Sequence, residues 1–295
     1  MYALQACEHS AFPSLRPLSL DAPPARAGEQ YVDPSTGIPF ARLLRSPLAP
    51  HSALISAQGP LLELVGTGVR TVSFLGIRVY TVGFYVEKRQ LDLIRQGRAS
   101  HGWQGYEPQR LLAATTTSEG GERADGDALV GALIAPSTSS ERTQSTGLGA
   151  QVAVQIVPLR STSLTHLRDG FARAILGRLG APSAAGSAQD DEGAFNSLTM
   201  LKSFFPARPL AKGTPLSVFG DPSSGALAFY VSPPAPSSSD LEPEHLGTVV
   251  APRAMRELFL SYFSTPEPSA GKKKPPAISA ELQQSCSQGF AKELP

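Results

Sequence analysis

Cysteine is scarce in this chain of 295 residues, which has only Cys7 and Cys286, near its two ends. Two such distant cysteines provide neither a disulfide framework nor the close spacing of a zinc site. The cysteine content is compatible with a reducing compartment, such as the cytosol or the mitochondrial matrix.

An excess of charge of one sign is also lacking, because 26 lysines and arginines stand against 25 aspartates and glutamates, for a formal net charge of +1. This balance gives no long-range attraction to nucleic acid or to an anionic membrane. The basic residues are dispersed and form no recognisable RNA- or DNA-binding motif. We therefore expect no nucleic-acid partner.

Long apolar runs are absent too. A membrane-spanning helix needs about 18 or more apolar residues in a row, and the best candidate, residues 53–69, is broken by Gln58, Pro60 and Glu63. The sequence therefore predicts no membrane span. The opening residues form no clear mitochondrial presequence, because acidic residues and prolines interrupt any basic amphipathic helix.

The segment 66–87 is rich in β-branched and aromatic residues, which predicts two strands joined near Gly76. A three-residue loop, residues 74–76, is favoured over a two-residue turn, because glycine then takes the left-handed position that closes the loop. This loop fixes the register and places Arg70 directly opposite Tyr80.

The same register gathers a candidate binding site on one face of the two strands. Directly opposed residues share a face, so we expect Arg70 and Tyr80 beside Val72, Val82 and Phe84. A guanidinium and a phenol among apolar neighbours can bind a carboxylate or a polarised carbonyl.

The other segments predict an α+β architecture, with helices segregated to one side of a sheet. Further strands are expected near residues 31–33, 38–40, 151–159, 215–219 and 226–231. Helices are expected at residues 89–96, 127–134, 163–180, 193–205 and 245–263. The chain divides into a disordered lead (1–30), a domain (31–265) with flexible insertions near 113–150 and 182–192, and a solvated tail (266–295) that leads to a weak last helix.

Several blocks together resemble the chalcone isomerase superfamily. The pattern Gly-x-Gly-x-Arg, a glycine turn and then Val-Tyr-x-x-Gly-x-Tyr-Val, within residues 66–87, resembles its signature hairpin. Blocks at residues 31–40, 156–171 and 213–231 follow in the order that this family shows. The run His-Leu-Arg-Asp-Gly-Phe, residues 166–171, is most similar to the fungal mitochondrial branch, the "altered inheritance of mitochondria" proteins.

The resemblance covers residues 30–265 apart from the low-complexity insertions. It implies a large antiparallel sheet, a layer of helices on one face and an apolar ligand cleft between them. It also implies a mitochondrial location.

The resemblance implies a role for Arg70 in particular. Arginine at this position is shared by the catalytic branch, where it steadies charge on the substrate, and by the fatty-acid-binding branch, where it pairs with a carboxylate. Tyr80 matches the fatty-acid-binding branch, whereas plant isomerases have threonine there. The tyrosine and asparagine that isomerases carry on the cleft helix are both missing from residues 163–173, and a second threonine is missing from residues 232–236.

The predicted helix at residues 163–180 supplies the remaining candidates, with Ser163 as its N-cap. Arg168 falls at the edge of the apolar stripe, where it can pair with Asp169 or add a second cation over the cleft. His166 falls on the side away from the stripe, which favours a solvent-facing imidazole over a haem ligand.

We therefore interpret the chain as a chalcone-isomerase-fold protein without isomerase activity that binds an amphipathic carboxylate, either a fatty acid or haem, in an apolar cleft. No catalytic residue, no metal site and no certain cofactor is assigned. Two alternatives stay open: a divergent isomerase-type intramolecular lyase, and a structural protein with a vestigial cleft. The predicted ligand-binding residues are Arg70, Tyr80, Val72, Val82, Phe84 and Arg168.

Overall fold

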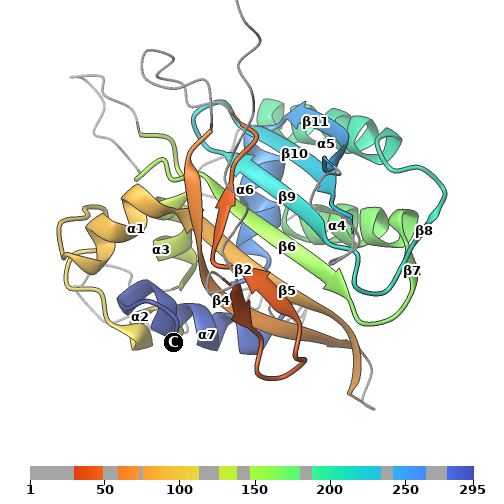
Figure 1. Cartoon of the computed structure of the whole chain (residues 1–295). Helices are drawn as coiled ribbons and strands as arrows, with labels where there is room; N and C mark the ends of the chain where they lie inside the picture. Colours follow the sequence, from red (N-terminus) through yellow and green to blue (C-terminus); the bar gives the residue numbers. More distant parts are fainter. Residues whose placement is uncertain are drawn as a thin grey trace, which may run out of the picture.

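The computed structural model describes residues 30–48, 59–72, 76–112, 126–137, 147–179, 188–233, 242–263 and 278–295 (Figure 1). Its centre is one sheet of seven antiparallel strands. In spatial order the strands are β11 (Glu244–Val250), β10 (Ala226–Val231), β9 (Leu216–Asp221), β6 (Val152–Pro158), β5 (Ile77–Glu87), β4 (Leu61–Val72) and β3 (Leu43–Arg45). The predicted large antiparallel sheet is confirmed.

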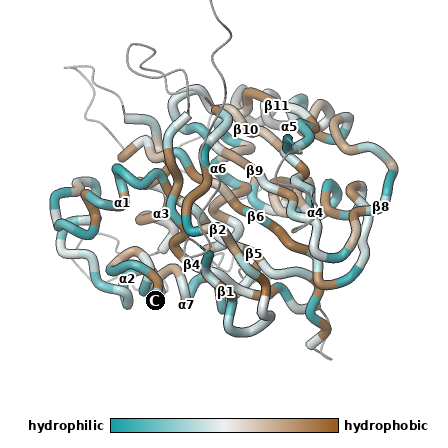
Figure 2. The backbone as a smooth tube through the Cα atoms, in the orientation of Figure 1, coloured by the Kyte–Doolittle hydropathy of each residue, from teal (hydrophilic) through white to brown (hydrophobic). Residues whose placement is uncertain are grey.

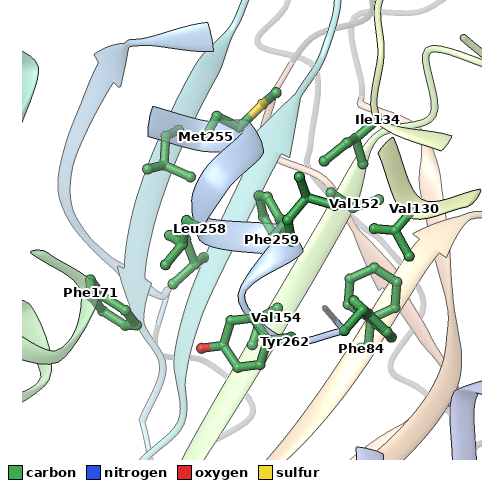
Figure 3. Close-up of a cluster of buried hydrophobic side chains, with 14 of the residues drawn as sticks. Phe84, Val130, Ile134, Val152, Val154, Phe171, Met255, Leu258, Phe259 and Tyr262 are labelled. Atoms are coloured by element: carbon green, nitrogen blue, oxygen red, sulfur yellow. The ribbon is translucent and has the colours of Figure 1, made fainter. Parts of the chain in front are cut away.

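All seven helices contribute buried side chains to a single core on one face of the sheet, which confirms the predicted helical layer (Figure 1). They are α1 (Lys88–Arg95), α2 (Pro108–Leu112), α3 (Gly126–Leu133), α4 (Leu164–Leu179), α5 (Ala188–Ser203), α6 (Pro252–Leu260) and α7 (Ala280–Ala291). Figure 3 shows this core, where α6 lies over β6 and places Phe259 near Val152. A strand that is buried on both faces has an almost continuous run of apolar residues. Figure 2 shows the central strands as mostly hydrophobic.

The opposite face of the sheet is covered by a small hairpin of β1 (Gln30–Val32) and β2 (Pro39–Ala41). Phe40 packs there against Tyr85 and is 1% exposed. The hairpin is tied to the sheet by a buried hydrogen bond in which the Thr67 hydroxyl donates to Asp33 Oδ2 at 2.6 Å. A second small pair, β7 (Thr162–Ser163) and β8 (Pro209–Leu210), flanks α4.

The C-terminal helix α7 corrects the predicted solvated tail. Its apolar residues recur with helical spacing and are fully buried against β4, so residues 278–295 belong to the domain. The lysine- and proline-rich linker before them concealed this signal at the sequence level. The buried residues are Leu282, Cys286 and Phe290.

The glycines of the hairpin motif have a packing role at this contact. A Cβ at Gly68 would collide with the backbone of Leu282, and one at Gly289 would collide with the Val65 carbonyl oxygen. Glycine permits such a close approach of two backbones because it has no side chain. The Gly-x-Gly spacing in β4 therefore seats α7 on the sheet.

The predicted helix over residues 245–263 is wrong for its first half. Residues 244–250 form the edge strand β11, which pairs with β10, and Val250 is 65% exposed. The pairing of β11 with β10 at the edge of the sheet outweighs the helical spacing of the apolar residues in this segment. Helix α6 begins at Pro252, in the first turn, where proline is tolerated because its missing N–H has no intrahelical partner.

The predicted helix at residues 163–180 is confirmed within one residue at each end. Ser163 Oγ accepts a hydrogen bond from the backbone N–H of His166 at 3.1 Å, as expected of an N-cap. The expected disordered lead and flexible insertions fall largely on residues 1–29, 113–125, 138–146 and 180–187, which lie outside the described residues. Within the described part of the chain, no helix is both long enough and apolar enough to cross a membrane.

Candidate functional site

The β4–β5 hairpin brings the two main candidate residues together. Arg70 pairs with Tyr80, as predicted, and their neighbours Val69 and Thr81 continue the register. The guanidinium carbon of Arg70 lies 6.0 Å from the centre of the Tyr80 ring. The two side chains therefore act at one place on the sheet.

The predicted three-residue loop is wrong, although it led to the observed pair. Val72 pairs with Ile77, so four residues separate the strand ends, and the register shifts by one between Arg70 and Thr71. This bulge restores the predicted pairing of Arg70. Gly76 has the expected left-handed backbone, with φ of +64°, whereas residues 73–75 lie outside the described residues.

A cavity of about 560 Å³ opens beside this pair. Its volume lies within the range of about 300–1,000 Å³ that is usual for small-molecule sites. The hairpin contributes Arg70, Thr71, Val72, Val79 and Tyr80 to the lining. Helix α4 contributes His166, Leu167, Gly170, Phe171, Arg173, Ala174, Gly177 and Arg178. The third wall is Ser261, Tyr262 and Ile278.

Small residues of α4 leave the space that forms the cavity. Gly170, Ala174 and Gly177 all line it, and no atom lies within 4 Å of the place where a Cβ would stand at either glycine. Their helical spacing puts them on one side of α4. The cavity therefore lies beside the apolar stripe of the helix, not directly beneath it.

The position of the cavity changes the roles that the sequence predicted for His166 and Arg168 on α4. His166 was expected to face away from the cleft, but it lines the cavity, as does the exposed Arg173. Arg168 does not line it, and its Nε donates to Asp169 Oδ1 at 2.8 Å, which lowers the pKa of that carboxyl. The structural pairing of Arg168 is thus the role that the structure supports.

Val82 and Phe84 lie deeper on the same strand than the cavity reaches. Both are 0% exposed and belong to the main core, and Phe84 packs edge-on against Phe263 with ring centres 4.7 Å apart. Of the predicted apolar residues of the site, the structure places only Val72 in the lining.

The cavity lining brings two phenols and a guanidinium together. Burial raises the pKa of Tyr80, and the adjacent Arg70 partly opposes this rise. Burial also raises the pKa of Tyr262 well above its usual value, and the charge of Arg70 acts in the opposite direction. Both phenols therefore stay protonated at neutral pH and can donate hydrogen bonds.

The cavity is positive in charge, because its described lining contains arginines and a histidine but no aspartate or glutamate. Arg178 is paired with the buried Glu257 at 2.9 Å. Tyr262 was missed at the sequence level because its position depends on the turn that follows α6. Such an arrangement suits an anionic group with an apolar body.

A profile of the family described as "Chalcone isomerase like" matches residues 61–276. The chain belongs to this chalcone isomerase-like family. Among solved structures, a fatty-acid binding protein from Arabidopsis thaliana has a TM-score of 0.52 at 16% identity, covering 89% of this chain and 98% of that protein. The profile match and this shared architecture confirm the predicted fold.

Several yeast relatives of this chalcone isomerase-like chain are named "Altered inheritance of mitochondria protein 18, mitochondrial". The protein from Eremothecium gossypii is 28% identical over 211 residues, or 70% of this chain and 62% of the relative. The protein from Lachancea thermotolerans is 29% identical over 159 residues, or 53% and 47%. The chain thus spans less than two thirds of these two relatives. Their names agree with the predicted mitochondrial location.

Proposed function

We propose that this chalcone isomerase-like protein is non-catalytic and binds an amphipathic carboxylate, a fatty acid or haem, in the cavity beside α4. The observation that carries the proposal is the pair Arg70 and Tyr80 in the lining of a cavity with no described acidic lining residue. The Arabidopsis thaliana protein of the same fold is itself a fatty-acid binding protein.

The head group of such a ligand would bind at Arg70 and Tyr80. An ionised carboxylate only accepts hydrogen bonds, whereas a guanidinium and a protonated phenol donate them. A carboxylate transferred from water needs a charged partner to offset its lost hydration. Arg70 supplies that charge, since no acid of the described chain forms an ion pair with it.

The apolar body of the ligand would lie against the other lining residues. The hairpin, α4 and the segment after α6 each offer apolar surface to the cavity, through Val72, Val79, Leu167, Phe171 and Ile278. Burial of an acyl chain gains roughly 0.8 kcal/mol for each methylene removed from water. A long acyl chain therefore binds more tightly than a short carboxylate.

The fluorescent fatty acid cis-parinaric acid, titrated into purified protein, tests this proposal. We expect Arg70→Ala to weaken binding by about 10- to 150-fold, because a hydrogen bond to a charged group is worth about 1.5–3 kcal/mol. Tyr80→Phe should have a smaller effect, since a neutral hydroxyl bond is worth about 0.5–1.5 kcal/mol.

Arg78→Ala is the matched control, because Arg78 lies on the same hairpin but donates to the Ser35 carbonyl and does not line the cavity. Equal affinities for wild type, Arg70→Ala and Arg78→Ala would refute the proposal. The open alternative, a divergent isomerase-type lyase, requires the same protein to accelerate chalcone cyclisation. We expect it to leave the spontaneous rate unchanged.

Haem is the second ligand of the proposed class, because its propionates are carboxylates. The described residues fit it in one respect: His166 is the only histidine in the described lining, and histidine is a common axial ligand of haem iron. A bound haem would supply redox or gas-binding chemistry through its iron. Arg70 would hold a propionate in that case, and His166 would face the iron.

A further inference from the structure

Tyr262 carries a hydroxyl group into an otherwise apolar part of the core. The residue is 1% exposed, and its neighbours Phe259 and Phe263 are fully buried. No residue in the described part of the chain forms a hydrogen bond with this hydroxyl. A phenol hydroxyl that forms no bond within the protein and lines a cavity is available to a ligand there.

The hydroxyl of Tyr262 is directed toward the cavity. Tyr262 and Phe171 both line it, and Figure 3 shows the Tyr262 oxygen turned to the side on which Phe171 lies, away from Phe84. Arg70 and Tyr80 line the same cavity. These three groups therefore face one cavity.

We propose that Tyr262 is a third ligand-binding residue, which donates its hydroxyl proton to the carboxylate that Arg70 and Tyr80 also bind. This inference rests on the proposed function and adds to it a preference for the free acid over its ester or alcohol. A guanidinium offers only donors and each protonated phenol can donate as well, so the three groups match the free, ionised acid. An ester or an alcohol of the same chain length lacks the charge and some of the acceptor sites, and binds more weakly.

The backbone around Tyr262 holds the phenol in place without a ligand. The Tyr262 N–H donates to the Phe259 carbonyl at 3.2 Å, and the Ile278 N–H donates to the Ser261 carbonyl at 3.2 Å. Gln283 Nε2 of α7 donates to the Phe263 carbonyl at 2.9 Å. A donor that is fixed in advance costs little entropy when the ligand binds, and so contributes more of its hydrogen bond to affinity.

The test compares wild type with Tyr262→Phe, using cis-parinaric acid and its methyl ester as probes. We expect Tyr262→Phe to weaken binding of the acid about tenfold, as for a hydrogen bond to a charged acceptor. Binding of the ester should change little. The melting temperature of the ligand-free protein should stay the same or rise, because the substitution removes a buried hydroxyl that has no described partner.

Tyr85→Phe is the matched control. Its hydroxyl is also buried but donates to the Ala41 carbonyl at 3.0 Å, on the face of the sheet that the β1–β2 hairpin covers. We expect Tyr85→Phe to lower the melting temperature and to leave the affinity for the acid unchanged. Tyr262→Phe should therefore lose affinity for the acid without losing stability, whereas Tyr85→Phe should lose stability without losing affinity.

Two results would overturn the role of Tyr262. Unchanged affinity of Tyr262→Phe for the acid, with a clear loss in Arg70→Ala, would refute it and leave the proposed function intact. Equal losses for acid and ester would show that the phenol only shapes the cavity wall. Failure of the wild-type protein to bind the acid at all would overturn both this inference and the proposed function.

Discussion

Arg70 differs from Arg95 and Arg178 in its partner. Arg95 is paired with Glu63 at 2.6 Å, and Arg178 is paired with Glu257 at 2.9 Å. Arg70 instead lies beside the phenol of Tyr80, with no acid in the described lining of the cavity. A guanidinium in this position retains most of its binding capacity for an external anion.

His166 distinguishes the two ligands of the proposed class. We expect His166→Ala to reduce or abolish the Soret change on addition of haemin, because the imidazole lines the cavity where iron would need an axial ligand. The same variant should change the affinity for cis-parinaric acid much less than Arg70→Ala does, since the imidazole is exposed and the proposed carboxylate partners are Arg70 and Tyr80. Absorbance and fluorescence titrations measure the two effects.

His245→Ala controls for the general loss of an imidazole, because His245 stacks on Tyr230 at a distance of 4.7 Å and does not line the cavity. An unaltered Soret band in His166→Ala would exclude the imidazole as an iron ligand. It would then leave the fatty acid as the better supported member of the ligand class.

Sequence alone predicted the Arg70–Tyr80 pair from a loop of the wrong length, and the bulge between Arg70 and Thr71 offset that error. It could not place His166 correctly, because the apolar stripe of a helix identifies the side facing the core. Here the cavity lies next to that stripe, over Gly170 and Gly177. Glycines at helical spacing were the available signal, since they cost helix stability and need a compensating reason.

At the scale of elements, most strands, α4 and the presence of a last helix were predictable, whereas the burial of α7 and the strand β11 were not. The signals were local for the first group: period-two patterns and the Ser163 cap. For β11 the decisive fact is its pairing with β10, which no local pattern reveals. Pro252 was nevertheless a usable marker of the true start of α6.

The small residues of α4 lead to a prediction about this element. We expect Gly170→Leu to fill the cavity and to abolish saturable binding of cis-parinaric acid, because the site beside Gly170 is open and faces the lining. The same change should raise the free energy of unfolding by up to about 1 kcal/mol, since leucine is a better helix former than glycine. Titration and urea unfolding measure the two quantities.

Gly193→Leu in α5 is the matched control, because Gly193 is exposed, has open space around its Cβ position and does not line the cavity. It should give the gain in stability without the loss of binding. Normal binding by Gly170→Leu would mean that the ligand does not enter the cavity at this point on α4.

At the scale of the whole molecule, the cavity joins three distant parts of the chain: the hairpin at residues 70–72 and 79–80, α4 at residues 166–178, and residues 261, 262 and 278. Long-range packing of this kind determines which side chains meet. This packing follows from the order of the strands in the sheet and from the contact between α7 and β4. No local sequence pattern predicts either of them.

The same burial makes the molecule sensitive to alkali. Burial raises the pKa of Tyr80, Tyr85 and Tyr262 above the usual value near 10, and it raises the thiol pKa of Cys286. The folded state therefore keeps protons that the unfolded state releases as pH rises. Full stability is present below about pH 8.5, where the unfolded thiol begins to ionise, and each buried tyrosine then lowers the free energy of unfolding by about 1.4 kcal/mol per pH unit above 10.

We accordingly expect the urea midpoint to be flat between pH 7 and pH 8, to decline gently near pH 9 and to fall steeply from about pH 10. Tyr262→Phe should reduce the steepness of the fall above pH 10, because it removes one group that ionises only on unfolding. A midpoint that stays constant from pH 8 to about pH 11 would show that these phenols ionise as readily in the folded protein as in the unfolded chain.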